Sequence, residues 1–332
     1  MFSLALLLLV IALALLFDYV NGFHDTANAI ATSVSTKALT PRGAIMVAAG
    51  LNFLGALSGT GVAKTIGKGL VAPEVVTGQV LVAALSGAIF WNIFTWYSGI
   101  PSSSSHALIG GVVGAVVAGL GFSSVNWSGF KEILAALILS PVVAFTLGSV
   151  IMTILFWIFK DTSPAKINNN FRRLQVLSAC MAAFSHGSND AQKTMGIITM
   201  GLVSAGYLRS FDVPLWVIIA CAMAMALGTA AGGWKIIRTM GGKIFRIEPI
   251  NGFAADFTSS CVIYGATLLH APVSTTHVVS SSIMGVGAAK RFKGVRWGIA
   301  QQIITAWLLT IPSSGVVSYM IYKLLGIFPL FR

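Results

Sequence analysis

Four polar segments interrupt otherwise apolar stretches of the chain, and their residue types suit ion binding. Two of them, 21–28 and 185–193, carry an aspartate among amide, histidine and hydroxyl side chains. The other two, 101–106 and 272–277, run from a proline through serine or threonine to a histidine. Proline followed by Ser or Thr is typical of a helix start, whose free N–H groups attract anions. A nearby carboxylate can then hold the cation or proton that balances the anion.

The surroundings of these segments are those of a membrane protein. Hydrophobic residues make up 56% of the 332 residues and charged residues only 9%, against roughly 25% in soluble domains. Apolar stretches of helix length recur along the whole chain. The net charge of +12 comes from basic residues that mostly lie between these stretches, as in loops at a membrane surface. We therefore expect a multi-pass plasma-membrane protein embedded in the lipid bilayer, with no nucleic-acid partner and no cofactor.

The two halves of the chain resemble each other. An offset of 171 residues relates four pairs of landmarks: Pro101 and Pro272, His106 and His277, Pro141 and Pro312, Lys64 and Lys235. Many transporters consist of two copies of one helical unit. We predict a first membrane repeat at 1–159, a basic linker at 160–173 and a second membrane repeat at 174–332.

The predicted repeats point in opposite directions through the membrane. The apolar stretch 106–121 has 16 residues, so a helix there would be about 24 Å long, short of the roughly 30 Å hydrocarbon core. The basic loops 235–246 and 290–296 both favour the cytoplasmic side, so the chain between them would enter the membrane and return. The equivalent loop 119–126 of the first half is uncharged. We therefore predict an all-α polytopic membrane protein of two inverted-topology repeats with broken helices and re-entrant hairpins, with roughly 10–12 membrane segments.

Hydroxyl and amide side chains of the polar segments are the predicted ligands of a small tetrahedral oxyanion. Hydroxyls beside a helix start add hydrogen-bond donors without adding a full charge. In the alternative interpretation, these side chains only bond the preceding helical turn or pack between helices. The predicted substrate ligands are Ser102, Ser103, Ser104, Ser105, Ser274, Thr275, Thr276, Asn28 and Gln192.

Acidic residues inside apolar segments are the predicted coupling groups. A carboxylate at that depth costs about 2.5–3.5 kcal/mol on insertion scales and is a functional candidate, although a structural ion pair would also explain it. Asp25 and Asp190 occupy matching positions in the two halves and are stronger candidates than Asp18 and Asp256. Such a carboxylate can coordinate sodium, take a proton, or accept the remaining proton of hydrogen phosphate, which sulfate lacks at neutral pH. The predicted coupling residues are Asp25, Asp190, Asn21, Asn189, His24 and Lys193.

At these residues the sequence resembles the inorganic phosphate transporter (PiT) family. The motifs that carry the resemblance are 22–28, 187–193 and the two Pro-Ser/Thr-His segments, and the likeness extends across both halves. The resemblance implies a secondary transporter of inorganic phosphate with inverted repeats, re-entrant hairpins, a substrate site near mid-membrane and usually a homodimer. It implies symport with sodium in some members, and with protons or as neutral metal phosphate in others.

The family's Asn-Asp signature falls on 189–190 in the second half, whereas His24 takes the place of its Asn in the first half. An imidazole is a poor sodium ligand that titrates near neutral pH, so His24 favours a co-transported proton or divalent metal over sodium. Lys193 stands where Asn28 stands in the other half. Two interpretations of Lys193 stay open: its ammonium neutralises Asp190 and removes the need for one mobile cation, or the long side chain reaches toward the membrane surface.

We therefore predict a symporter that moves inorganic phosphate by alternating access, coupled to protons or carrying metal phosphate. Alternatives within this class are a sodium-coupled phosphate symporter and a carrier of sulfate or another oxyanion. An anion channel is an alternative of a different class, but a channel has no need of the buried acids found here. An intramembrane hydrolase would need a defined nucleophile, whereas four consecutive serines single out none and no GxSxG motif is present. We expect a transporter and not an enzyme.

Overall fold

Helices account for both halves of the chain and follow one another in the same order. The computed structural model describes residues 3–232 and 244–328, without the side chains of residues 26–28. The first half contains α1 (Leu4–Ser35), α2 (Pro41–Ala56), α3 (Gly61–Gly69), η1 (Pro73–Val75), α4 (Gly78–Ser98), α5 (Ser104–Leu120), η2 (Phe122–Ser124) and α6 (Trp127–Ile158). The second half contains α7 (Pro164–Ser204), α8 (Leu215–Ala231), α10 (Pro249–Leu268), α11 (Thr275–Arg291), η3 (Phe292–Gly294) and α12 (Trp297–Leu325). No strand occurs within the described ranges, and the predicted all-α fold is confirmed.

Several of these helices can cross a membrane. By length and hydropathy, α1, α4, α6 and α12 are candidate spans. α2 and α3 together form a further candidate span that is bent by 71° at the break between them. α5 and α8 are apolar but shorter. The polytopic membrane fold is confirmed, whereas the figure of roughly 10–12 segments stays a prediction.

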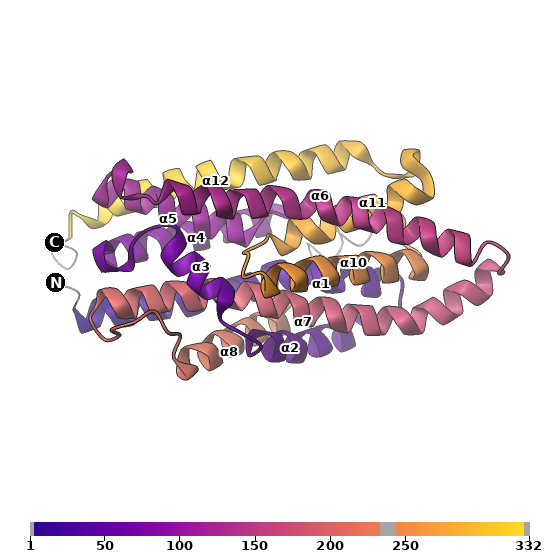
Figure 1. Cartoon of the computed structure of the whole chain (residues 1–332), viewed down its shortest axis with the longest axis horizontal. Helices are drawn as coiled ribbons and strands as arrows, with labels where there is room; N and C mark the ends of the chain where they lie inside the picture. The colour runs from indigo at the N-terminus through magenta and orange to yellow at the C-terminus, as the bar shows by residue number, and fades with distance from the viewer. Residues whose placement is uncertain (1–2, 233–243, 329–332) are drawn as a thin grey trace.

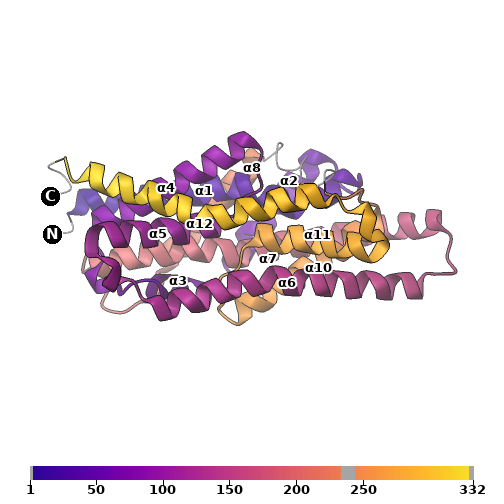
Figure 2. The ribbon, with the colours of Figure 1, turned by 90° about the horizontal axis from the view of Figure 1, so that it is seen from above.

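The helix contacts between the two halves are reciprocal. α5 begins within the polar segment 101–106 (the first tip) and packs along α12, and α11 begins within the segment 272–277 (the second tip) and packs along α6. Likewise, α1 packs against α8, and α7 packs against α2. α5 extends from the middle of the molecule toward the end that holds both termini, whereas α11 extends toward the opposite end (Figures 1 and 2). Two inverted repeats produce this arrangement.

Basic and uncharged connections between helices lie at opposite ends of the molecule. The loop after α6 and the basic loop 290–296 lie at the end opposite the termini, whereas the uncharged loop 119–126 lies at the end with the termini (Figure 1). Most of the other basic loop, 235–246, lies outside the described residues, as does the landmark Lys235. α7 begins at Pro164, inside the segment 160–173. The boundaries of the two repeats and the linker stay a prediction.

Local structure also recurs at equivalent positions. Trp127 begins α6 and Trp297 begins α12. The Nε1–H of Trp127 donates to the carbonyl of Phe122 at 3.1 Å, and that of Trp297 donates to the carbonyl of Phe292 at 3.0 Å. The similarity found in the sequence therefore corresponds to a repeated structural unit.

Glycines let the helices that carry the aspartate motifs cross closely. Gly22 of α1 lies against the backbone of α8, and Gly187 of α7 lies against the backbone of α2. A Cβ at either glycine would collide with a backbone carbonyl oxygen, so a larger residue would push the helices apart. Each aspartate follows its glycine by three residues and so shares that helix face. The crossings therefore bring Asp25 and Asp190 into the interior.

Candidate functional site

The first and second tips meet in the middle of the molecule. Ser103 Oγ accepts the backbone N–H of His106 at 3.2 Å, and Ser274 Oγ accepts that of His277 at 3.3 Å. These bonds cap the starts of α5 and α11 in the same way. The rings of His106 and His277 lie against each other, with centroids 4.3 Å apart. Two helix starts from opposite ends of the molecule thus converge.

Asp25 is buried against the second tip. Its Oδ1 accepts a hydrogen bond from Thr276 Oγ1 at 3.1 Å and lies 2.6 Å from Nδ1 of His24. The other ring nitrogen of His24 lies 3.3 Å from Thr95 Oγ1 in α4, which accepts a bond from Ser102 Oγ at 2.7 Å. A chain of polar contacts therefore runs from the first tip through α4 and α1 to the second tip.

Asp190 is buried beside the neighbouring hydroxyl of the same tip. Thr275 Oγ1 donates to its Oδ2 at 3.0 Å, and Nε2 of His186, one turn earlier in α7, lies 3.3 Å from that oxygen. Lys193 pairs with Oδ1 of the carboxylate and donates to Ser105 Oγ of α5 at 2.6 Å. Two adjacent hydroxyls of the second tip are thus bonded to the carboxylates of the two repeats.

Asn189 shapes the second tip instead of facing the carboxylates. Its Nδ2 donates to Thr267 Oγ1 at 2.9 Å and to the carbonyl of Ala271 at 3.2 Å. Its Oδ1 accepts the backbone N–H of Val273 at 3.2 Å. Asn21 is buried in α1, and its Oδ1 has no hydrogen-bond partner among the described residues.

The remaining predicted ligands lie in different surroundings. Gln192 Oε1 accepts the backbone N–H of Val62 at 2.8 Å, and its Nε2 donates to the carbonyl of Ser188 at 2.7 Å. Gln192 is therefore held against the start of α3, and its role as a substrate ligand stays a prediction. Ser104 is buried in the first turn of α5. The side chain of Asn28 lies outside the described part of the chain.

Three polar residues of the cluster are missing from the sequence prediction. His186 precedes Asp190 by four residues, so helical spacing alone was enough to place both on one face. Asn52 of α2 has its Oδ1 3.1 Å from Nδ1 of His186. Thr95 links His24 to the first tip. Asn52 and Thr95 belong to helices without a motif, so only the fold identifies them.

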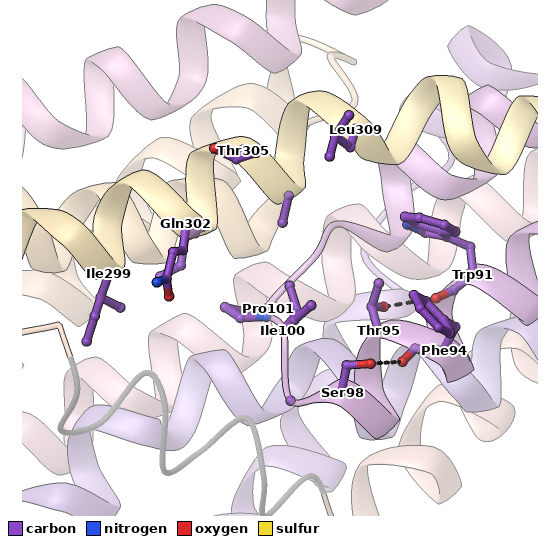
Figure 3. A pocket seen from close by; sticks show the side chains of 13 residues that line it. Trp91, Phe94, Thr95, Ser98, Ile100, Pro101, Ile299, Gln302, Thr305 and Leu309 are labelled. Atoms are coloured by element: carbon purple, nitrogen blue, oxygen red, sulfur yellow. Dashed lines mark hydrogen bonds between the residues drawn. The ribbon is translucent and has the colours of Figure 1, made fainter.

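Cavities approach the buried cluster from different directions. One, of about 660 Å³, lies between the end of α4, the first tip and α12, with Thr95 and Pro101 in its wall (Figure 3). A second, of about 600 Å³, is lined by His106 and His277. A smaller cavity, of about 330 Å³, lies at the break between α2 and α3, and its lining includes Lys64, Gln192 and His270. Both aspartates are almost fully buried, so the carboxylates are closed off from solvent.

A buried polar cluster where broken helices converge inside a multi-pass bundle is typical of secondary membrane transporters. Comparison with known proteins gives the family. The chain belongs to the Phosphate transporter family, which matches residues 21–318.

Individual relatives agree over almost the whole chain. A probable low-affinity inorganic phosphate transporter of Bacillus subtilis (strain 168) is 55% identical over 326 residues, which cover 97% of this chain and 98% of that protein. A protein of the same name from Rhizobium meliloti (strain 1021) is 50% identical over 319 residues, which cover 96% of each. A solved structure described as the sodium-dependent phosphate transporter has a TM-score of 0.88 at 26% identity, covering 98% of this chain and 100% of that chain. The family resemblance and a plasma-membrane transporter that is not an enzyme are thereby confirmed.

Proposed function

We propose that the protein is a symporter that carries inorganic phosphate by alternating access, with protons as the coupling ion. The supporting observation is that Thr275 and Thr276, adjacent at a helix start, each donate a hydroxyl to the carboxylate of a different repeat. These hydroxyls and the N–H groups of the helix start are the donors that an oxyanion needs. The carboxylates that they face can accept the proton of hydrogen phosphate. Sulfate carries no such proton at neutral pH, so phosphate is favoured.

Proton coupling is assigned to His24 and Asp25. Nδ1 of His24 lies 2.6 Å from the carboxylate, and both side chains are buried. One proton added to this pair changes its charge by a full unit, which offsets part of the charge of an incoming phosphate. A histidine ring can hold one proton or two, and its neutral imidazole is a poor ligand for sodium.

Sodium and a divalent metal are the two alternatives for the co-transported ion. The similar solved structure is described as sodium-dependent, which favours sodium. Uptake of neutral metal phosphate would use the carboxylates as metal ligands together with phosphate oxygens. Within residues 3–232 and 244–328, no group of three or more His, Cys, Asp or Glu side chains is arranged to hold a metal ion. A metal would therefore enter as cargo with phosphate.

Alternating access follows from the opposite directions of the two tips. The first tip is held by α4 and α5, which reach inward from the end with the termini, and the second by α10 and α11, which reach inward from the basic end (Figure 1). Withdrawal of one tip or the other would expose the cluster on different sides. The positive-inside rule assigns the basic end to the cytoplasm. A homodimer, which the family resemblance implies, completes the proposal and is tested by the mass of the purified protein in detergent.

Uptake of labelled phosphate into proteoliposomes tests the proposal, with proton, sodium and magnesium gradients imposed one at a time. We expect only the proton gradient to accelerate uptake, and sulfate not to compete. Asp25→Asn and Asp190→Asn should each reduce uptake about tenfold or more, because each removes a carboxylate that faces the second tip. Asp161→Asn, in the exposed loop after α6, is the matched control. Wild-type uptake in both site variants would contradict the assigned roles, and acceleration by sodium or magnesium alone would identify the corresponding alternative.

A further inference from the structure

Oxygen atoms enclose the ammonium of Lys193. It pairs with the carboxylate of Asp190, donates to Ser105 Oγ at 2.6 Å and donates to the carbonyl of Val273 at 2.8 Å. An ammonium has three N–H donors, and these three acceptors use all of them. The side chain is only 2% exposed, so it does not reach toward the membrane surface.

The three acceptors come from three parts of the fold. Asp190 belongs to α7, Ser105 to the first turn of α5 and Val273 to the second tip. Ser105 Oγ also donates to the Val273 carbonyl at 3.1 Å. Carboxylate, hydroxyl and carbonyl oxygens are also the ligands that hard metal cations prefer. The ammonium of Lys193 therefore fills a site of three oxygen ligands (the oxygen cage), and this site joins both tips to α7.

The two repeats balance their carboxylates in different ways. Oδ1 of Asp25 lies 2.6 Å from Nδ1 of His24, and no lysine contact to this carboxylate occurs among the described residues. Asp190 pairs with Lys193, and His186 lies 3.3 Å from its other oxygen. In the first repeat, the position equivalent to the lysine holds a neutral residue type, asparagine.

We infer that Lys193 is a resident cation. Its ammonium fills the place that a mobile monovalent cation would otherwise occupy, so Asp190 passes through the transport cycle already neutralised and the second repeat binds no coupling ion. This inference rests on the proposed phosphate symport and deepens it, because it confines ion coupling to the first repeat. It follows that a small neutral residue at this position opens the cage to a cation and makes transport depend on one.

Lys193→Asn tests this consequence, because it introduces the residue type of the first repeat and supplies an amide oxygen. At a fixed proton gradient, we expect its phosphate uptake to fall about tenfold or more in choline medium and to recover in sodium or lithium medium. Lys193→Met removes the charge without supplying an oxygen and should stay inactive in all three media. Wild type and Lys323→Asn, which removes a lysine that donates to the Ala118 carbonyl at 3.1 Å, should transport equally in all three.

Thermal unfolding in detergent gives a readout that does not require transport. At equal ionic strength, sodium chloride should raise the midpoint of Lys193→Asn relative to choline chloride, and the wild-type midpoint should not respond. The double variant with Asp190→Asn and Lys193→Met lacks both charges and should behave identically in the two salts. If wild type carries no phosphate under any gradient, the proposed function fails and the unfolding shifts alone decide the inference.

Four results would overturn the inference. The first is a wild type whose uptake requires a monovalent cation. The second is Lys193→Asn protein that responds to sodium neither in uptake nor in stability. The third is Lys193→Asn protein that folds in neither salt, because the open cage should accept sodium. The fourth is a sodium response in the double variant.

Discussion

Replacing Thr276 with valine removes one hydroxyl from the meeting point of the two repeats while keeping the shape of the side chain. This hydroxyl donates to Asp25 Oδ1 at 3.1 Å, alongside the His24 contact at 2.6 Å. A hydrogen bond to a charged group contributes about 1.5–3 kcal/mol. In the proposed mechanism, phosphate takes over this donor when it binds, so the KM reports the difference between the new bond to phosphate and the bond lost to Asp25. The bond to Asp25 is long for an O–H···O⁻ contact and belongs at the weak end of this range. A bond to phosphate at the strong end exceeds it by about 1.5 kcal/mol, and because about 1.36 kcal/mol corresponds to a factor of ten, the KM for phosphate should rise about tenfold.

The assay is the initial rate of phosphate uptake as a function of phosphate concentration at a fixed proton gradient, with KM and the maximal rate determined separately. Thr199→Val is the matched control, because Thr199 is buried in α7 and donates to the carbonyl of Met195 in its own helix at 2.8 Å. Its KM should equal that of wild type. A KM for Thr276→Val within about twofold of the control would refute the assignment of the second tip as the phosphate site.

Three further predictions concern helix packing, proton coupling and the smaller cavity. Gly187→Ala should lower the free energy of unfolding by about 1–3 kcal/mol, because the added Cβ collides with α2. Gly50→Ala is the control, because a Cβ there meets no described atom within 4 Å. Denaturant unfolding in detergent compares the two variants, and equal stabilities would contradict the close crossing of α7 and α2. His24→Asn should weaken the acceleration of phosphate uptake by a proton gradient, because it removes the side chain assigned to carry the coupling proton, and a wild-type response to the gradient would exclude His24 as the coupling group. Gln192→Ala should lower stability by about 0.5–1.5 kcal/mol through the lost bond to α3 while leaving the KM for phosphate near wild type; a large rise in KM would make Gln192 a substrate ligand after all.

Local rules account for the parts of the site that the sequence could predict. Ser103 and Ser274 cap their helices because capping depends on a few neighbouring residues, and the offset of 171 residues carries the same geometry from one tip to the other. The tips converge because inverted copies place equal elements around one axis. The pairing of Thr275 and Thr276 with carboxylates of different repeats depends instead on where α1 and α7 pass the start of α11. No local rule determines where these helices meet.

Helix rotation explains why neighbours in one motif have different surroundings. Successive residues of an α-helix are rotated by about 100°, so Gln192, two positions after Asp190, points roughly 200° away from it. Lys193 and His186 are three and four positions from Asp190 and share its face. The polar segment 185–193 contains all four of these residues. Only the helical rotation separates the face of α7 that contacts the tips from the face that contacts α3. Thr95 lies on another helix, so no spacing within the motif could identify it.

The contacts of the two tips are unequal although the tips occupy equivalent positions in the repeats. The second tip donates hydroxyls to both carboxylates, whereas Ser105 of the first tip contacts Lys193, the partner of Asp190, and Ser102 is linked to Asp25 through Thr95 and His24. Withdrawal of the second tip would therefore break both hydroxyl bonds, and withdrawal of the first tip would leave them in place. An incoming phosphate that accepts bonds from Thr275 and Thr276 removes the contacts that hold the second tip against α1 and α7. Under the proposed function, phosphate binding would thus favour withdrawal of the second tip over withdrawal of the first, so that the site opens on one side at a time.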